Sequence, residues 1–247
     1  MSSVTGWGVS TRAVVVEAIG SAFLLMAVVG SGIMGERLAG GNIAVALLAN
    51  TLATGGALVA LLLALGPISG AHFNPAVSLA EATRGGLSWP GAVAYTVAQL
   101  FGAFIGIALA HVMFGLPIYS WSTHARAGGG QVVGEMVATF GLLSVIQGCA
   151  RHRPSATPFA VGAYIASAYW FTSSTSFANP AVTLARAASD TFAGIRPADA
   201  PGFLFGQLVG TCSATILFRW LTPPVSRIAD PSGVRDNALP HGPAVRR

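Results

Sequence analysis

The stretch SGAHFNPAV at residues 69–77 is matched, more than a hundred residues later, by TSFANPAV at residues 175–182. Asn is favoured at the N-cap of a helix, and Pro fits the first helical turn because its missing N–H would find no partner there. Each Asn-Pro therefore predicts a helix that begins at that point. The residues just before each motif, GPISGAHF and TSSTSF, are rich in Gly, Ser or Thr and predict non-helical backbone.

The composition excludes a soluble domain. Of the 247 residues, 53% are hydrophobic and only 9% are charged, whereas soluble domains carry about 25% charged residues. The net charge is +5, but the basic residues are scattered or terminal rather than clustered on one face, so we expect no nucleic-acid partner. Cys149 and Cys212 fall in apolar segments and have no disulfide or metal-ligand spacing. We expect a polytopic protein of the lipid bilayer, without a metal or cofactor.

Six apolar segments could cross a hydrocarbon core of about 30 Å, at residues 12–33, 43–66, 91–113, 131–150, 158–173 and 202–222. Two shorter helix-like pieces, HFNPAVSLAEATR and FANPAVTLARAASD, follow the second and the fifth of them. We therefore predict an all-α membrane protein with six transmembrane helices and two re-entrant half-helices. Residues 1–11 form a polar N-terminal segment, residues 12–222 the membrane domain, and residues 223–247 a Pro-, Arg- and Asp-rich tail that we expect to be disordered.

The two halves of the membrane domain repeat one another. Each half, at about residues 12–113 and 131–222, contains three apolar segments and one short Asn-Pro-Ala-Val piece. Polar residues also match between the first and third segments of each half: Glu17 and Gln99 in one, Glu135 and Gln207 in the other. Because three is an odd number of crossings, the second copy must lie upside down in the membrane, as in the inverted repeats of many transport folds.

The arginines predict the orientation of the chain, since cytoplasmic loops carry an excess of positive charge. With the N-terminus inside, four arginines lie outside, namely Arg37, Arg126, Arg186 and Arg196. The other nine lie inside, namely Arg12, Arg84, Arg151, Arg153, Arg219, Arg227, Arg235, Arg246 and Arg247. We therefore expect a multi-pass protein of the inner (plasma) membrane with both termini cytoplasmic.

The two short helices predict a pore. Each has about ten residues and a length of about 15 Å, so two that enter from opposite sides would together cross one bilayer core. Their N-termini would meet at the midplane, where two half-charges disfavour cations and protons. The residues expected at this midplane are Asn74, Pro75 and Ala76 in one copy, and Asn179, Pro180 and Ala181 in the other. The non-helical loops must then line a water-filled path, with carbonyls expected from Gly70, Ala71, His72, Phe73, Thr175 and Phe177.

The two intramembrane carboxylates have two interpretations. Ionisable residues within spans suggest function by default, so one hypothesis is a proton-coupled secondary transporter that uses Glu17 or Glu135. The matched pair fits a structural role better, because each carboxylate can accept hydrogen bonds from a non-helical loop. Gln99 and Gln207 have the same structural interpretation. The usual hydrolase, zinc-protease and phosphate-loop patterns do not occur in the sequence, so we do not expect an enzyme.

The two Asn-Pro-Ala motifs, the run SGAHFNPAV, the paired glutamates and the paired glutamines together resemble the aquaporins, or major intrinsic proteins. The resemblance covers about residues 12–222. It implies a six-span fold with two half-helices, a homotetramer with one pore per subunit, and passive movement of water or small uncharged solutes.

The sequence departs from this family at the outer constriction of the pore. Water-selective members usually have Arg directly after the second Asn-Pro-Ala, where this chain has Val182. The other constriction positions correspond to Thr54, Ser176 and either Ser167 or Tyr169, depending on where the connection before the second motif is shortened. Small uncharged side chains imply a wider and less cationic opening. We therefore expect permeation by glycerol-like polyols.

The run NPAVTLAR at residues 179–186 is also similar to bacterial aquaglyceroporins associated with arsenic resistance, which pass arsenite as its neutral hydroxide. Its last residue, Arg186, lies four residues after Val182 and so on the same helical face. Arg186 could replace the missing guanidinium, or it could form a salt bridge with Asp190 at i+4.

Overall fold

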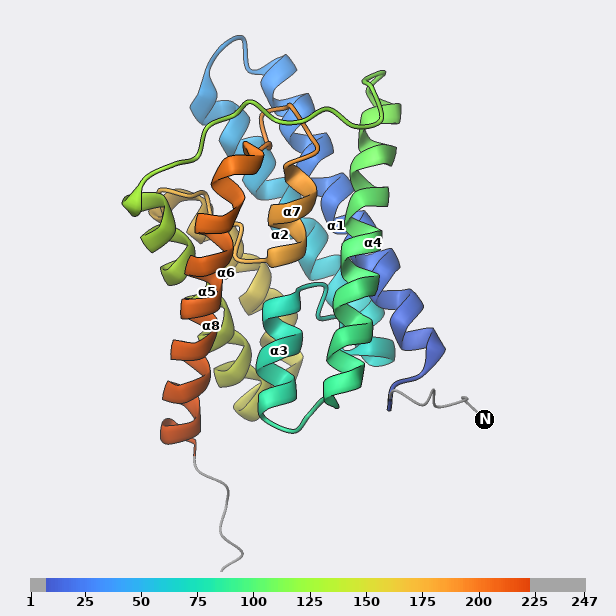
Figure 1. Ribbon diagram of the computed structural model, residues 1–247, viewed down its shortest axis with the longest axis vertical. Coiled ribbons are helices and arrows are strands. Elements are labelled where there is room, and N and C mark those ends of the chain that lie inside the picture. Colours follow the sequence, from blue (N-terminus) through green and yellow to red (C-terminus); the bar gives the residue numbers. More distant parts are fainter. Residues whose placement is uncertain (1–7, 223–247) are drawn as a thin grey trace, which may run out of the picture.

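The computed structural model describes residues 8–222, whose regular elements are all helices (Figure 1). The expected tail at 223–247 and the first seven residues of the N-terminal segment lie outside the described residues. Six long helices are present: α1 (Thr11–Leu38), α2 (Ile43–Ser69), α4 (Trp89–Met113), α5 (Gly129–His152), α6 (Thr157–Phe171) and α8 (Ala200–Leu221). Two short helices, α3 (Pro75–Thr83) and α7 (Pro180–Arg186), begin at the Pro of each Asn-Pro-Ala motif, as the sequence predicts.

Five of the long helices have the length and apolar composition needed to cross a membrane. The sixth, α6, has only 15 residues and a length of about 22 Å. A 3₁₀ turn at Pro154–Ala156 precedes it and extends the same segment. The architecture of six long helices and two short ones is the one predicted, with α6 shorter than a typical span.

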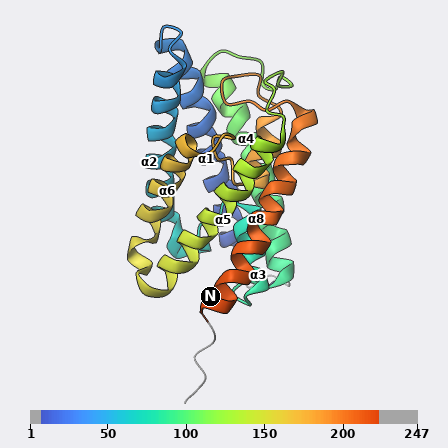
Figure 2. The same cartoon turned by 90° about the vertical axis from the view of Figure 1, so that its left-hand side faces the viewer.

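The helices pack as two similar halves. In the first half α1 packs against α2 and α4, and in the second α5 packs against α6 and α8. The halves meet where α2 contacts α6, which Figure 2 shows side by side on one flank, and where α4 contacts α7 and α3 contacts α8. The short helices α3 and α7 contact each other and lie one above the other in the middle of the bundle (Figure 1). The start of α1 and the end of α8 both lie in the lower part of the bundle in this view.

Matched glycines bring the third span of each half against the first. Gly102 and Gly106 of α4 lie against the backbone of Ala18 and Ala22 in α1, so closely that no Cβ would fit. Gly206 and Gly210 of α8 lie in the same way against the backbone of α5. Small residues at such crossings let helices approach closely, which is the usual way that helices associate in a membrane. The internal repeat therefore extends from the sequence to the packing.

We predict that Gly102→Ala destabilises the protein by about 2 kcal/mol or more, because the added methyl would overlap a backbone carbonyl that cannot move aside. The matched control is Gly56→Ala, where a methyl group meets nothing within 4 Å. The control should be neutral or slightly stabilising, since Ala favours helices more than Gly does. Thermal unfolding of both purified variants in detergent measures the difference, and equal melting temperatures would contradict the packing described.

Candidate channel and its outer constriction

The two Asn-Pro-Ala motifs meet through a reciprocal pair of hydrogen bonds. The Asn74 side-chain nitrogen donates to the Ala178 carbonyl at 2.7 Å, and the Asn179 side-chain nitrogen donates to the Phe73 carbonyl at 2.8 Å. Each Asn also caps its own short helix, because its side-chain oxygen accepts from a backbone N–H of the first turn. The N-termini of α3 and α7 are thereby joined head to head. Each amide keeps a second N–H that these bonds do not use.

The loops before the short helices have an unusual backbone. Five residues other than Gly have positive φ angles between 46° and 58°, namely Ala71, Phe73, Thr175, Ser176 and Ala178. This left-handed conformation costs about 1–2 kcal/mol for a residue with a Cβ. The sequence predicted non-helical loops but gave no signal for this strain, since none of these residues is one that favours the conformation. The surrounding structure must therefore hold the loops in place.

In the first half, the Glu17 carboxylate holds the loop. One oxygen accepts from the Ser69 hydroxyl at 2.7 Å and the His72 N–H at 2.9 Å, and the other accepts from the Phe73 N–H at 2.7 Å. The Gln99 amide donates to the same carboxylate at 2.8 Å. Glu17 and Gln99 are fully buried. Glu17 is thus an acceptor for backbone that would otherwise be unsatisfied.

The second half repeats this arrangement with Glu135. Its two oxygens accept from the Phe177 and Ala178 N–H groups, each at 2.8 Å. The Gln207 amide donates to the carboxylate at 2.6 Å and also to the Thr183 hydroxyl of α7 at 2.8 Å. These contacts give both glutamates and both glutamines the structural positions that their sequence match suggested.

A cavity of about 510 Å³ runs along the inside of the bundle. One flank is apolar, with side chains from α2, α5 and α6 such as Leu58, Leu142 and Ile165. The other flank is formed by the two loops and the two capping asparagines. Of the residues predicted to provide carbonyls, five line the cavity: Gly70, Ala71, His72, Phe73 and Phe177. Thr175 does not line it, because its hydroxyl is turned to Arg126 instead.

Four of the predicted constriction residues lie together in this cavity: Thr54, Tyr169, Ser176 and Val182, all buried. The Tyr169 hydroxyl donates to the Thr54 hydroxyl at 3.4 Å. Ser167 was the alternative to Tyr169, and the structure places it elsewhere, on the exposed side of α6 with its hydroxyl bonded to the Ala163 carbonyl. Two residues along a helix turn the side chain by about 200°, so only one of the two can face the cavity.

Arg186 also lines the cavity and is only 2% exposed. Its Nε donates to the Ala193 carbonyl, and its guanidinium carbon lies 3.3 Å from the centre of the Phe177 ring. The expected salt bridge with Asp190 is wrong for the described residues, since the Asp190 carboxylate accepts from Thr123 instead. Of the two alternatives stated for Arg186, the one that remains is that it replaces the missing guanidinium, which would make the opening beside Val182 more cationic than Val182 alone implies.

Arg126 is a site residue that sequence reasoning missed, because a lone Arg in a long loop resembles any other loop charge. It lies in the connection between α4 and α5. Its guanidinium donates to the Gly194 carbonyl at 2.8 Å and the Thr175 hydroxyl at 3.3 Å, and lies 5.1 Å from the centre of the Phe177 ring. Burial lowers its pKa to about 10, so the group remains charged at neutral pH.

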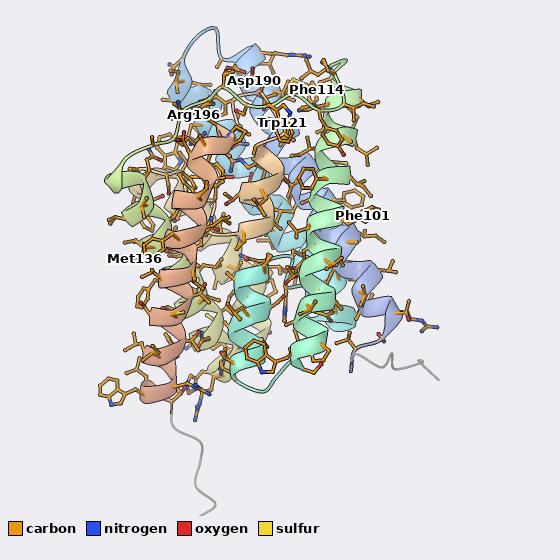
Figure 3. All side chains as sticks on the ribbon, in the orientation of Figure 1. Phe101, Phe114, Trp121, Met136, Asp190 and Arg196 are labelled. Atoms are coloured by element: carbon orange, nitrogen blue, oxygen red, sulfur yellow. The ribbon has the colours of Figure 1, made fainter. Side chains whose placement is uncertain are left out.

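This arginine helps to close the end of the bundle opposite the start of α1. Figure 3 shows Asp190, Arg196 and Trp121 at that end, where the α4–α5 connection crosses over the loop after α7. The backbone of Ser122 donates to Ala187 at 2.9 Å. The connection therefore covers that end of the bundle, while none of its residues lines the cavity.

Residues 4–171 match the family described as Major intrinsic protein. The chain belongs to this family. It is 52% identical to the aquaglyceroporin AqpS of Rhizobium meliloti (strain 1021) over 218 residues. These matched residues cover 88% of this chain and 93% of the relative. It is also 40% identical over 96 residues to aquaporin NIP1-1 of Zea mays, covering 38% of this chain and 34% of the relative.

The fold is shared with a solved channel. The X-ray structure of the aquaglyceroporin from Plasmodium falciparum superposes with a TM-score of 0.61 at 22% identity, over 87% of this chain and 96% of that one. The family consists of channels rather than enzymes, so this protein is a membrane channel for water and small solutes. The coupled-transporter alternative, which would use Glu17 or Glu135, gains no support from these relatives, and the loops engage both of these carboxylates.

We predict that Glu135→Ala destabilises the protein by about 2–4 kcal/mol, because it leaves two buried N–H groups without an acceptor. Glu135→Gln should lose less, since its amide oxygen can still accept. The control is Glu36→Ala on the exposed end of α1, which should change the melting temperature little. Thermal unfolding in detergent compares the three variants. A Glu135→Ala protein as stable as the control would contradict the structural role of this carboxylate.

Proposed function

We propose that the channel conducts glycerol-sized neutral molecules in addition to water. The observation that carries this proposal is the constriction itself, where Thr54, Ser176 and Val182 present small side chains to one cavity. A polyol has a hydrocarbon side and a hydroxyl side. The apolar side chains of the cavity suit the hydrocarbon side of the polyol, and the loop and asparagine groups suit its hydroxyl side. The 52% identity to an aquaglyceroporin supports the same solute class.

Arsenite as its neutral hydroxide is a second proposed solute. This molecule is small and uncharged, and it presents three hydroxyl groups. Like glycerol, it needs an uncharged path with hydrogen-bonding groups along it. The run at residues 179–186, which is similar to arsenic-associated channels, supports the proposal. Protons and cations would be rejected by the paired positive ends of α3 and α7, each carrying about half a charge.

The membrane arrangement that we propose is a homotetramer in the inner (plasma) membrane with both termini cytoplasmic. The positions of the first and last long helices support the common side of the termini, because both described ends lie in the same part of the bundle (Figure 1). Large apolar side chains exposed on the outer faces, such as Phe23, Leu52 and Phe101, suit contact with lipid or with neighbouring subunits.

The proposal is tested by light scattering from proteoliposomes that are shifted into glycerol, urea or sucrose. Glycerol should enter at a rate well above that of protein-free vesicles, sucrose should not, and internal solute should only reach the external concentration. Accumulation against a gradient driven by pH would instead support the coupled transporter. Glycerol entry at the rate of empty vesicles would contradict the proposed solute class.

We predict that Val182→Arg lowers glycerol permeability at least about tenfold while water still passes, since a long charged side chain would narrow the constriction and lose solvation there. Val182→Leu adds bulk without charge and is the matched control, with a smaller expected loss. Stopped-flow measurement of glycerol and water permeability on the same vesicles separates the two solutes. Glycerol flux unchanged by the arginine would show that Val182 does not form the constriction.

A further inference from the structure

We infer that Arg186 supplies the guanidinium of the outer constriction from one helical turn beyond its usual place, and that with the Ser176 hydroxyl it forms a subsite for neutral solutes with neighbouring oxygen atoms. This inference rests on the proposed solute class. It names the residues that would recognise such a solute and that would keep protons out.

The position of Arg186 gives the first part of the argument. Residues four apart on a helix share a face, so Arg186 lies on the same side of α7 as Val182, and both line the cavity. The Nε group is held by the Ala193 carbonyl. The two terminal nitrogens have no hydrogen-bond partner within residues 8–222. A buried guanidinium with unused donors beside a cavity is able to donate to a solute oxygen.

The charge of Arg186 is also not neutralised by the nearby acids. Asp190 accepts from the backbone N–H and the hydroxyl of Thr123 at 2.8 Å and 3.0 Å. Asp199 is paired with the Arg196 side chain at 2.8 Å and accepts from the backbone N–H of Arg126. Glu135, from α5, is engaged by the loop before α7. The positive charge of Arg186 therefore acts on the cavity.

Phe177 and Arg126 position this guanidinium. Both arginines lie close to the Phe177 ring, at 3.3 Å for Arg186 and 5.1 Å for Arg126, and a cation over an aromatic face is favourable. Arg126 does not line the cavity and is fixed by carbonyl and hydroxyl acceptors in the loops. Because like charges repel, a fixed Arg126 favours an Arg186 that turns its free nitrogens toward the cavity.

Ser176 provides the second group of the subsite. It lines the same cavity and is 3% exposed, and its hydroxyl has no hydrogen-bond partner within the described residues. A buried hydroxyl without a partner costs about 1–3 kcal/mol, and a solute hydroxyl in the constriction would satisfy it. A solute with two neighbouring oxygens can accept from Arg186 with one and pair with Ser176 through the other. Vicinal polyols and neutral trihydroxides both have this pattern.

The solute test compares two isomers of equal size, propane-1,2-diol and propane-1,3-diol, after subtraction of their rates into protein-free vesicles. The wild-type channel should favour the 1,2-isomer, whose oxygens are neighbours. Ser176→Ala and Arg186→Leu should each lower the ratio of the two permeabilities by about fivefold, the effect of one lost hydrogen bond. Arg37→Gln is the control, because Arg37 is exposed and does not line the cavity, and it should leave the ratio unchanged.

The second arm measures proton entry with an internal pH dye. Arg186→Leu should raise proton permeability at least about tenfold, because a unit charge near the path contributes several times the thermal energy. Arg186→Lys keeps the charge and should stay near the wild type, as should Ser176→Ala. The inference would be overturned if Arg186→Leu admitted protons at the wild-type rate and kept the wild-type ratio of the two diol permeabilities.

The outcomes are separable from those of the proposed function. If the wild-type protein conducts no glycerol, the solute class fails, and the proton arm still decides whether Arg186 guards the pore. If the wild-type protein conducts glycerol but Arg186→Leu keeps both the wild-type diol ratio and the wild-type proton entry, only the inference fails. Should Arg186→Leu not purify as a single species, Ser176→Ala and Arg186→Lys decide through the diol ratio, since Lys lacks the fork of two terminal nitrogens. An unchanged ratio in both would overturn the subsite.

Discussion

The fold depends on two buried carboxylates that satisfy backbone which no helix can satisfy. Glu17 and Glu135 each accept two N–H groups from a loop deep in the bundle. Without these acceptors the N–H groups would be unpaired inside the bundle, and the need to pair every backbone group is the strongest constraint on any membrane structure. The half-helices, their meeting at the asparagines and the cavity beside them all require that the loops stay in this conformation. The carboxylates therefore explain why an ionisable residue is tolerated in a span without any role in proton transfer.

The inverted repeat makes the two halves similar in construction but leaves the two loops beside the cavity different. In the first loop His72 lines the cavity, bonds to the Ser78 hydroxyl at 3.0 Å and packs in a T-shaped arrangement with the Tyr95 ring. In the second loop Phe177 takes the matching position, and two arginines lie close to its ring. The repeat thus supplies the scaffold and the midplane twice, whereas the selectivity that we propose depends on residues that occur in one copy only. Such a difference is expected, because function depends on the residues of a site and not on the fold that carries them.

The sequence predicted the fold well because each element depends on local chemistry. Three local signals do not depend on tertiary contacts: Asn-Pro at a helix start, apolar runs long enough to cross a membrane, and matched glutamates. The site was predicted less completely. Whether Ser167 or Tyr169 faces the cavity depends on the length of one connection, and periodicity alone leaves that open. Arg126 gave no signal at all, because its position depends on how a long loop folds back over α7. The missed parts are those set by long-range packing.

The long connection between α4 and α5 is tied down along much of its length. Ser120, Ser122 and Thr123 bond to the segment just after α7, and His124 accepts from the Arg196 N–H. Surface loops usually tolerate insertions and deletions, because little depends on their exact length. Here the loop holds Arg126 against the Phe177 ring and the Thr175 hydroxyl, so a change of even one residue would shift a charge that packs behind the loop before α7. Under the proposed arrangement, variation in this loop would act on Arg186 indirectly, through Arg126 and the Phe177 ring that both arginines contact, without a substitution in the helices that surround the pore.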